Sequence, residues 1–173
     1  MTTTTTTTDP QIEAIFGAVE KAYGWVPNLI KEMSASVPTI QVYLGGQEAL
    51  AKGSLSPKEQ QAVQLTISAF NDCEYCQAVH GTFGRKVRVA EGDIEAIRAG
   101  QLPADPALAP VVETTRLLLD KRGWLSPEEL QAAEDRGITK TRLHEIIAYI
   151  GLKTITNYIN HLAHTPVDSQ FQA

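Results

Sequence analysis

Apolar side chains recur every three or four positions over two long stretches of this chain, the spacing of an amphipathic helix that buries one face. The first stretch ends before Gly123, and its face holds Leu108, Val111, Val112, Thr115, Leu118 and Leu119. The second is longer, and its face holds Leu143, Ile146, Ile147, Ile150, Thr154, Ile155, Tyr158, Ile159 and Leu162. Such a long, wide stripe suits a central helix or a helix at a subunit interface.

Helix-start signals divide the rest of the chain. Asp9 and Pro10 begin a first helix that runs to about Gly24, and Pro27 and Pro38 separate two further helices. Two capping boxes with proline at the first helical position predict two more starts, at Ser56-Pro57-Lys58-Glu59 and Ser126-Pro127-Glu128-Glu129. No alternating run bounded by hairpin turns indicates a strand. The sequence therefore predicts an all-α fold.

Composition favours one ordinary globular domain. The chain has 173 residues, of which 43% are hydrophobic and 20% charged, so it is long enough to bury one core. The proline-rich segment Leu102–Pro110 is the best linker candidate, but it is short for a domain boundary. We expect the helical domain to span residues 9–173, after a disordered poly-Thr leader over residues 1–8.

Charge and hydropathy narrow the partners. The 15 basic and 20 acidic residues give a formal net charge of −5, which leaves no basic face for nucleic acid. No apolar run approaches the roughly 20 residues that cross a bilayer, and the N-terminus lacks the basic and apolar parts of a signal peptide. We therefore expect a cytoplasmic protein without a membrane partner. In that compartment a cysteine pair stays reduced unless it cycles.

The two cysteines of the chain form a Cys-x-x-Cys pair at Cys73 and Cys76, with His80 four residues further on. Asn71 or Asp72 can cap a helix that starts here, which places Cys73 in its first turn, where backbone N–H groups and the helix dipole favour a thiolate. The three side chains share one helical face, so the imidazole can take a thiol proton. This spacing predicts a redox or peroxidatic site.

Three other interpretations of the pair are weaker. A zinc site needs four ligands, and beyond His80 the chain offers only the remote His144, His161 and His164, which are interpreted as ordinary residues of the last helix. Two inert buried cysteines would not require a histidine in register. A thioredoxin-type pair follows a strand, and none is predicted. We therefore expect neither a metal nor a tightly bound cofactor.

The run from Leu55 to Gly81, with its Leu-Ser-Pro start, Asn71 and the Cys-x-x-Cys-x-x-x-His motif, resembles the AhpD-like alkylhydroperoxidases of the carboxymuconolactone decarboxylase superfamily. The resemblance is weaker but supportive over residues 24–28 and 157–168. It implies an all-helical protein that assembles as a trimer or hexamer. It also implies that Cys76 is the peroxidatic nucleophile, that Cys73 resolves its sulfenic acid as a disulfide, and that His80 relays protons.

Two positions depart from the family pattern. AhpD has a proton-relay glutamate twelve residues before its first motif cysteine, where this chain has Gln61, which cannot ionise. Glu59 lies close by, but its place in the capping box favours a structural role. AhpD also has a histidine between its cysteines, where this chain has Tyr75, a poor base at neutral pH. Both departures predict slow peroxidase turnover by an intact dithiol.

Together these observations predict a thiol-dependent peroxidase or disulfide reductase that takes a hydroperoxide and is restored by an outside dithiol or lipoyl-type donor. The alternative is a non-catalytic helical oligomer that senses redox state through the same pair. Decarboxylase or lactone chemistry is disfavoured, because the lactone decarboxylases of the superfamily do not rely on a Cys-x-x-Cys. Phe70 and Phe83 fit either an apolar approach to the thiols or core packing.

Overall fold

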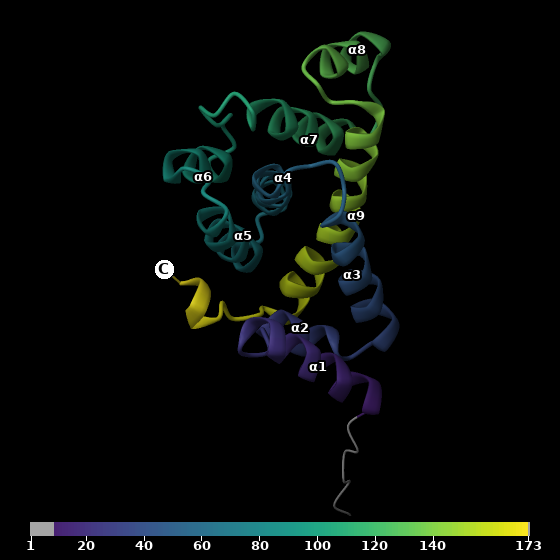
Figure 1. The fold of residues 1–173 in the computed structure, drawn as a ribbon, viewed down its shortest axis with the longest axis vertical. Coiled ribbons are helices and arrows are strands. Elements are labelled where there is room, and N and C mark those ends of the chain that lie inside the picture. The colour runs from purple at the N-terminus through teal and green to yellow at the C-terminus, as the bar shows by residue number, and fades with distance from the viewer. Residues whose placement is uncertain (1–8, 173) are drawn as a thin grey trace, which may run out of the picture.

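The computed structural model describes residues 9–172, which fold into helices joined by short connections (Figure 1). The elements are α1 (Pro10–Tyr23), α2 (Asn28–Met33), α3 (Val37–Leu50), α4 (Pro57–Phe70), α5 (Glu74–Lys86), α6 (Glu91–Arg98), α7 (Ala109–Lys121), α8 (Pro127–Asp135), α9 (Lys140–Ala163) and the 3-10 turn η1 (Ser169–Phe171). The predicted all-α fold is confirmed over these residues. The leader assigned to residues 1–8 lies outside them.

The helix-start signals act as the sequence predicts. Asp9 caps α1 by accepting a hydrogen bond from the Gln11 amide, and α1 ends at Gly24, whose φ of 86° suits glycine. Both capping boxes are present, at Ser56 for α4 and Ser126 for α8, with the serine and glutamate side chains each bonded to the backbone. These local signals fix where the central helices begin.

Helix α4 runs through the middle of the molecule and is seen almost end-on in Figure 1. It contacts α5, α6, α7 and α9. Its buried side chains include Val63, Leu65 and Ile67, so most of its circumference is covered. The long helix α9 passes beside it and also packs on α2 and α3. The turn between α4 and α5 lies against α9, with Phe70 and Asp72 exposed and Cys73 buried.

The buried side chains form two clusters. One joins α4 to α6, α7, α8 and the first half of α9, with Val63, Ile94, Val111 and Ile146 at its centre. The other joins α1, α2 and α3 to the start of α5, and it contains both cysteines and Tyr75. The dithiol is thus packed between the N-terminal helices and α9, away from bulk water.

Three local features differ from the sequence-based expectations. The helix α6 was not predicted, because it has only eight residues and a polar composition. The Cys helix is capped by Cys73 itself, with Cys76 in its first turn, instead of by Asn71 or Asp72. Asp72 adopts a left-handed backbone conformation with a φ of 54°, and the Asn71 side chain donates to Asn157 instead. The linker candidate Leu102–Pro110 covers most of the connection between α6 and α7, and its last two residues begin α7.

The buried face of α9 also differs from the predicted apolar stripe. Its fully buried positions include the polar residues Lys153, Thr156 and Asn157, while Tyr158 and Leu162 are exposed. The pattern gave the wrong face for the second half of α9, because this part of the helix buries polar groups around the cysteines. None of the described helices has the length and apolarity that a membrane span requires.

Candidate active site

The turn that precedes α5 positions the two thiols. The Cys73 amide donates to the Ser68 carbonyl at 2.9 Å, and the Cys73 carbonyl accepts from the Gln77 amide as the first bond of α5. Cys76 lies in the first turn, where free backbone N–H groups favour negative charge. Both side chains are only 1% exposed, and both cysteines are free.

Polar groups of α9 face the sulfurs. The Asn160 amide nitrogen Nδ2 donates to Cys76 Sγ at 3.3 Å and lies 3.8 Å from Cys73 Sγ. The hydroxyl of Thr156 lies 3.9 Å from Cys76 Sγ. Because an amide NH2 group can only donate, its placement here favours sulfur in the thiolate form. Neither residue was a candidate from the sequence.

A buried lysine connects the thiols to the histidine. Lys153 is 1% exposed, and its Nζ lies 2.8 Å from His80 Nε2 and within hydrogen-bonding reach of Cys76. On its other side, His80 Nδ1 lies 3.0 Å from Gln61 Oε1. A charged lysine must donate to Nε2, so Nδ1 carries the imidazole proton and donates it to Gln61. The order of contacts is Cys76, Lys153, His80, Gln61.

These contacts shift the pKa values of the two thiols in opposite directions. The hydrogen bond from Cys73, followed by the charge of Lys153, holds the pKa of Cys76 well below its usual value despite burial. The same hydrogen bond, together with burial, raises the pKa of Cys73. Burial and then the Lys153 charge hold the pKa of His80 well below its usual value. The site therefore pairs a Cys76 thiolate with a Cys73 thiol and a neutral imidazole.

Tyr75 points away from the sulfurs. Its hydroxyl donates to Asp168 Oδ2 at 2.6 Å and accepts from the Leu29 amide at 3.3 Å. Burial and the hydrogen bond to Asp168 raise the pKa of this phenol, which keeps it protonated. The Asp168 carboxylate also accepts from the Asn28 amide. Tyr75 thus ties the C-terminal segment and α2 to the Cys helix.

Glu59 is occupied by structural contacts. One carboxylate oxygen accepts from the Ser56 amide at 2.8 Å, which completes the capping box, and the other pairs with Arg142 of α9. Ser56 is the N-cap of α4, and Arg142 lies in the first turn of α9. Of the two positions considered as relay residues, Gln61 is the one in contact with His80.

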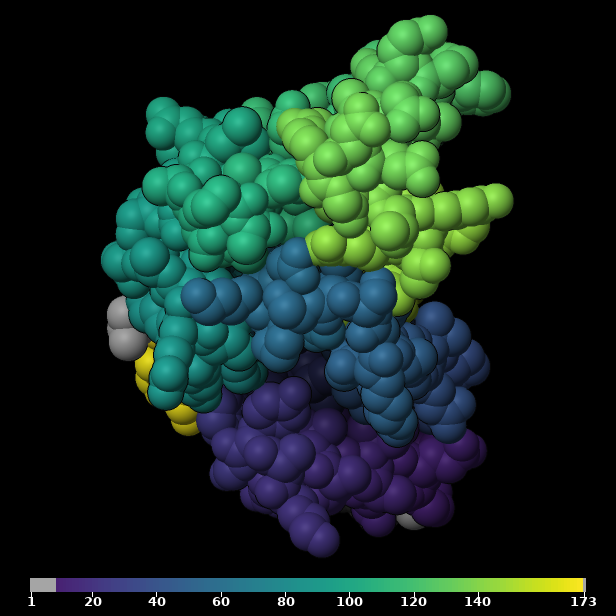
Figure 2. Space-filling model, turned by 45° about the horizontal axis from the view of Figure 1, so that its top comes forward, coloured from purple at the N-terminus to yellow at the C-terminus, as the bar shows by residue number. Residues whose placement is uncertain are grey.

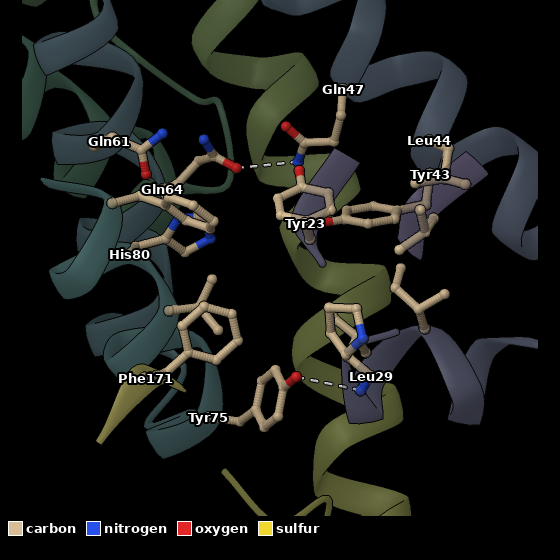
Figure 3. A pocket seen from close by; sticks show the side chains of 15 residues that line it. Tyr23, Leu29, Tyr43, Leu44, Gln47, Gln61, Gln64, Tyr75, His80 and Phe171 are labelled. Carbon is tan, nitrogen blue, oxygen red and sulfur yellow. Dashed lines mark hydrogen bonds between the residues drawn. The ribbon is translucent and has the colours of Figure 1, made fainter. Parts of the chain in front are cut away.

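A cavity of about 220 Å³ adjoins the dithiol between α1, α2, α3, α4 and α5. Figure 3 shows Gln61, Gln64 and His80 facing Tyr23, Tyr43 and Gln47 across it, with Tyr75, Leu29 and Phe171 at its lower end. In Figure 2 a recess lies between the purple N-terminal helices and the blue segment that leads into α4.

The cavity reaches the neighbours of the sulfurs. Neither cysteine lines it, but Tyr75 and His80 do, on either side of Cys76 along α5. Burial, and then the charge of Cys76, raise the pKa of Tyr43, which is another residue of the cavity wall. Phe83 also lines the cavity, whereas Phe70 is exposed and does not. The cavity therefore ends beside residues that flank Cys76 on α5 and does not reach either sulfur.

The sequence analysis missed Lys153, Thr156, Asn160 and Asp168. A lysine followed by Thr156, Asn157 and Asn160 at helical spacing inside a hydrophobic stretch is the signal that identifies the polar face of α9. No cluster of three or more histidine, cysteine or acidic side chains with the geometry of a metal site occurs within residues 9–172.

The fold and part of the sequence match known proteins. A model of the carboxymuconolactone decarboxylase family matches residues 41–111, which run from α3 to the start of α7 and include the Cys helix. No curated protein matches the sequence. The resemblance to the carboxymuconolactone decarboxylase superfamily is confirmed over residues 41–111 by the family match, and solved AhpD-like structures share the fold.

The similar folds are those of solved structures with low sequence identity. A peroxidase-related protein from Silicibacter sp. TM1040 gives a TM-score of 0.83 at 14% identity, covering 96% of this chain and 90% of that one. An AhpD-core, peroxidase-related protein from Ralstonia eutropha JMP134 also gives 0.83, at 17% identity and 94% and 88% coverage. The debrominase Bmp8 gives 0.71 at 16% identity, covering 94% and 89%. At these identities the likeness concerns the fold alone.

Proposed function

We propose that the protein is a thiol-dependent peroxidase of the AhpD-like type, with Cys76 as nucleophile, Cys73 as resolving thiol, and a dithiol as the outside reductant. The observation that carries the proposal is the environment of Cys76. Its thiolate is stabilised by Cys73, Lys153 and Asn160 next to a thiol partner of raised pKa. A low-pKa thiolate beside a second thiol is the arrangement that two-cysteine peroxidases need.

In the oxidative step, the Cys76 thiolate attacks the terminal oxygen of a hydroperoxide, and the O–O bond breaks. Sulfur gains the hydroxyl group as a sulfenic acid, and the alkoxide leaves. Lys153, the ammonium in contact with Cys76, supplies the proton that converts the alkoxide to an alcohol. The neutral His80 accepts a hydrogen bond from Lys153 through Nε2 and so holds the ammonium group beside Cys76, and the proton that Lys153 gives up is replaced from the thiols of the reductant when the disulfide is reduced.

In the resolving step, Cys73 attacks the sulfenic sulfur of Cys76, and water leaves as the disulfide forms. Two thiol groups of the reductant then restore the pair and become a disulfide themselves. The raised pKa of Cys73 keeps its proton available for the departing water. Tyr75 and Glu59 take structural positions in this scheme, and Gln61 orients His80.

The cavity suggests the class of peroxide. Its lining is largely apolar and aromatic, with Gln47, Gln61 and Gln64 as hydrogen-bonding groups, and it contains no lysine, arginine or carboxylate. Its only titratable nitrogen base, His80, is held neutral by burial and Lys153. An uncharged organic hydroperoxide suits this lining better than an anionic one.

Peroxide consumption tests the proposal, with cumene hydroperoxide as substrate and dithiothreitol as donor. Sulfenic acid is trapped in parallel with dimedone and located by mass spectrometry. We expect turnover in the unmodified protein, no sulfenic acid in Cys76→Ser, and accumulated sulfenic acid on Cys76 in Cys73→Ser. Sulfenic acid on Cys73 would reverse the assigned roles. If no dithiol supports turnover, the proposed peroxidase activity is wrong.

A redox sensor is the second candidate, and the burial of the thiols favours it. Both sulfurs are almost fully inaccessible, and neither lines the cavity, which suits a pair that oxidises once and is reduced slowly. A sensor would form the disulfide with peroxide but would not sustain turnover when dithiothreitol is in excess. Single-turnover oxidation without steady-state consumption therefore distinguishes the sensor from the peroxidase.

A further inference from the structure

A second cleft reaches the dithiol from the other side. It has a volume of about 270 Å³ and lies where the start of α5 meets the end of α9. It is lined by Asp72, Cys73, Glu74, Tyr75, Asn160, His161, His164 and Thr165. Cys76 and His80 do not line this cleft, and Cys73 does not line the cavity of Figure 3. Of the two openings, only this cleft is lined by a cysteine, and that cysteine is Cys73.

Two buried polar atoms in this cleft have no partner among the described residues. They are Asn160 Oδ1 and Thr165 Oγ1, on side chains that are 5% and 8% exposed. The Asn160 amide uses its nitrogen on the sulfurs, so its oxygen is left free to accept. A buried acceptor without a partner costs free energy, and a bound molecule with an N–H or O–H group removes that cost.

We propose that this cleft is the binding site of the reductant, and that an external thiol attacks the Sγ of Cys73 in the oxidised protein. The proposal rests on the disulfide chemistry of the proposed function. The attacking thiolate forms a bond to Cys73 Sγ, the Cys73–Cys76 bond breaks, and its electron pair leaves on Cys76. A second thiol of the reductant then attacks the mixed disulfide, releases Cys73 and closes the reductant's own disulfide.

The leaving group supports attack at this sulfur. Thiol–disulfide exchange is faster when the departing thiol has a low pKa. The contacts with Lys153 and Asn160 stabilise a Cys76 thiolate, whereas at Cys73 the effect of the Lys153 charge is outweighed by the hydrogen bond to Cys76 and by burial, which raise the pKa of Cys73. Access through the cleft therefore favours attack at Cys73, and the charges around the sulfurs favour Cys76 as the leaving group.

The lining also defines the chemical class of the reductant. With histidines counted as neutral, it carries two negative charges, from Asp72 and Glu74, and no lysine or arginine. A thiol that is uncharged or cationic near its sulfur, and that has a hydrogen-bond donor for Asn160 Oδ1, fits this lining. An anionic thiol is repelled by the carboxylates.

The test uses disulfide-bonded protein prepared with diamide, so that it does not depend on peroxidase turnover. It is reduced with cysteamine, 2-mercaptoethanol or 2-mercaptoethanesulfonate, and rates are compared per concentration of thiolate. We expect cysteamine, which is cationic, to react about ten times faster than the anionic 2-mercaptoethanesulfonate. Glu74→Gln removes one carboxylate and should make the ratio of these two rates smaller. Equal rates for all three thiols, or a ratio unaffected by Glu74→Gln, would overturn the assigned class.

The position of attack is tested on the same oxidised protein. Acid quenching followed by alkylation and tandem mass spectrometry should find the mixed disulfide on Cys73, and an adduct on Cys76 would overturn the proposal. His161→Trp, which fills the cleft, should slow reduction about tenfold. His144→Trp is the matched control, since it makes the same change at an exposed position earlier on α9.

Two further outcomes would contradict separate openings for the peroxide and the reductant. If His161→Trp slows peroxide oxidation and thiol reduction by the same factor, the two molecules share one entrance and the proposal is wrong. If His161→Trp changes the molecular mass in solution while reduction keeps its rate, the cleft is covered by a second copy of the chain, which also contradicts the proposal. If the protein has no peroxidase activity but His161→Trp still slows reduction of the disulfide by thiols, only the proposed function is wrong.

Discussion

Lys153 is the residue that determines the charge at the dithiol, because its Nζ contacts both Cys76 and His80 inside the fold. A lysine with 1% exposure is desolvated, and it is tolerated here because a thiolate and an imidazole nitrogen face it. A cation therefore lies between Cys76 and His80, whereas the resemblance to AhpD implies that His80 itself relays the proton. The pH dependence of Cys76 reactivity follows from this contact.

Replacement of Lys153 by methionine should raise the pKa of Cys76 and lower its reactivity at neutral pH. The thiolate exists above the pKa of the folded protein, so alkylation by iodoacetamide slows as the pH falls through that value. We expect the midpoint of the alkylation profile to move upward and the rate at pH 7 to fall about tenfold or more. Lys140→Met, at the exposed start of α9, is the control. An unmoved midpoint would contradict the assigned role.

Gln61 gives the second prediction at this scale, because its amide oxygen is the partner of His80 Nδ1. A carboxylate in its place would favour a charged imidazole and let His80 accept a proton through Lys153. We expect Gln61→Glu to raise the rate of peroxide reduction near neutral pH by about tenfold. Gln64→Glu, which adds a charge to the same cavity, controls for a general charge effect.

At the scale of elements, the start of α4 is held by Glu59, which caps the helix and pairs with Arg142 of α9. Glu59→Gln should lower the free energy of unfolding by about 1 kcal/mol, measured by urea denaturation, and leave peroxide consumption unchanged. Glu129→Gln makes the same change in the capping box of α8. Loss of activity at unchanged stability in Glu59→Gln would show that this carboxylate takes part in catalysis.

The helices and the thiol motif were predictable from the sequence, but the polar surroundings of the motif were not. Caps and prolines act through adjacent residues, which is why the starts of α1, α4 and α8 are correct. The start of α5 was misplaced because Asp72 takes a left-handed conformation that no local signal requires. Lys153 and Asn160 were missed because they lie 73 residues from His80 and 84 from Cys76, respectively, so only the packing of α9 brings them together.

At the scale of the whole molecule, the apolar stripe of α9 predicts self-association. Tyr158 and Leu162 are 58% and 85% exposed, and Leu162 lines a groove with Met33 and Ile159. We expect a trimer or hexamer, as the family resemblance implies, and Leu162→Glu should shift it toward smaller species, because a charge replaces buried apolar area. Light scattering at micromolar concentration checks both. A mass near 18.8 kDa for the unmodified protein would contradict the prediction.

The end of the chain closes one side of the cavity, and this has a consequence for engineering. Phe171 contacts Trp25, Tyr75 and Phe83, yet it belongs to neither core cluster. Its 3-10 turn is held to the body of the protein through Asp168, which accepts from Tyr75 and Asn28. Because Phe171 forms part of the cavity wall, a smaller side chain at this position should enlarge the cavity. A saturation library at position 171 is therefore a direct way to alter which molecules the protein accepts.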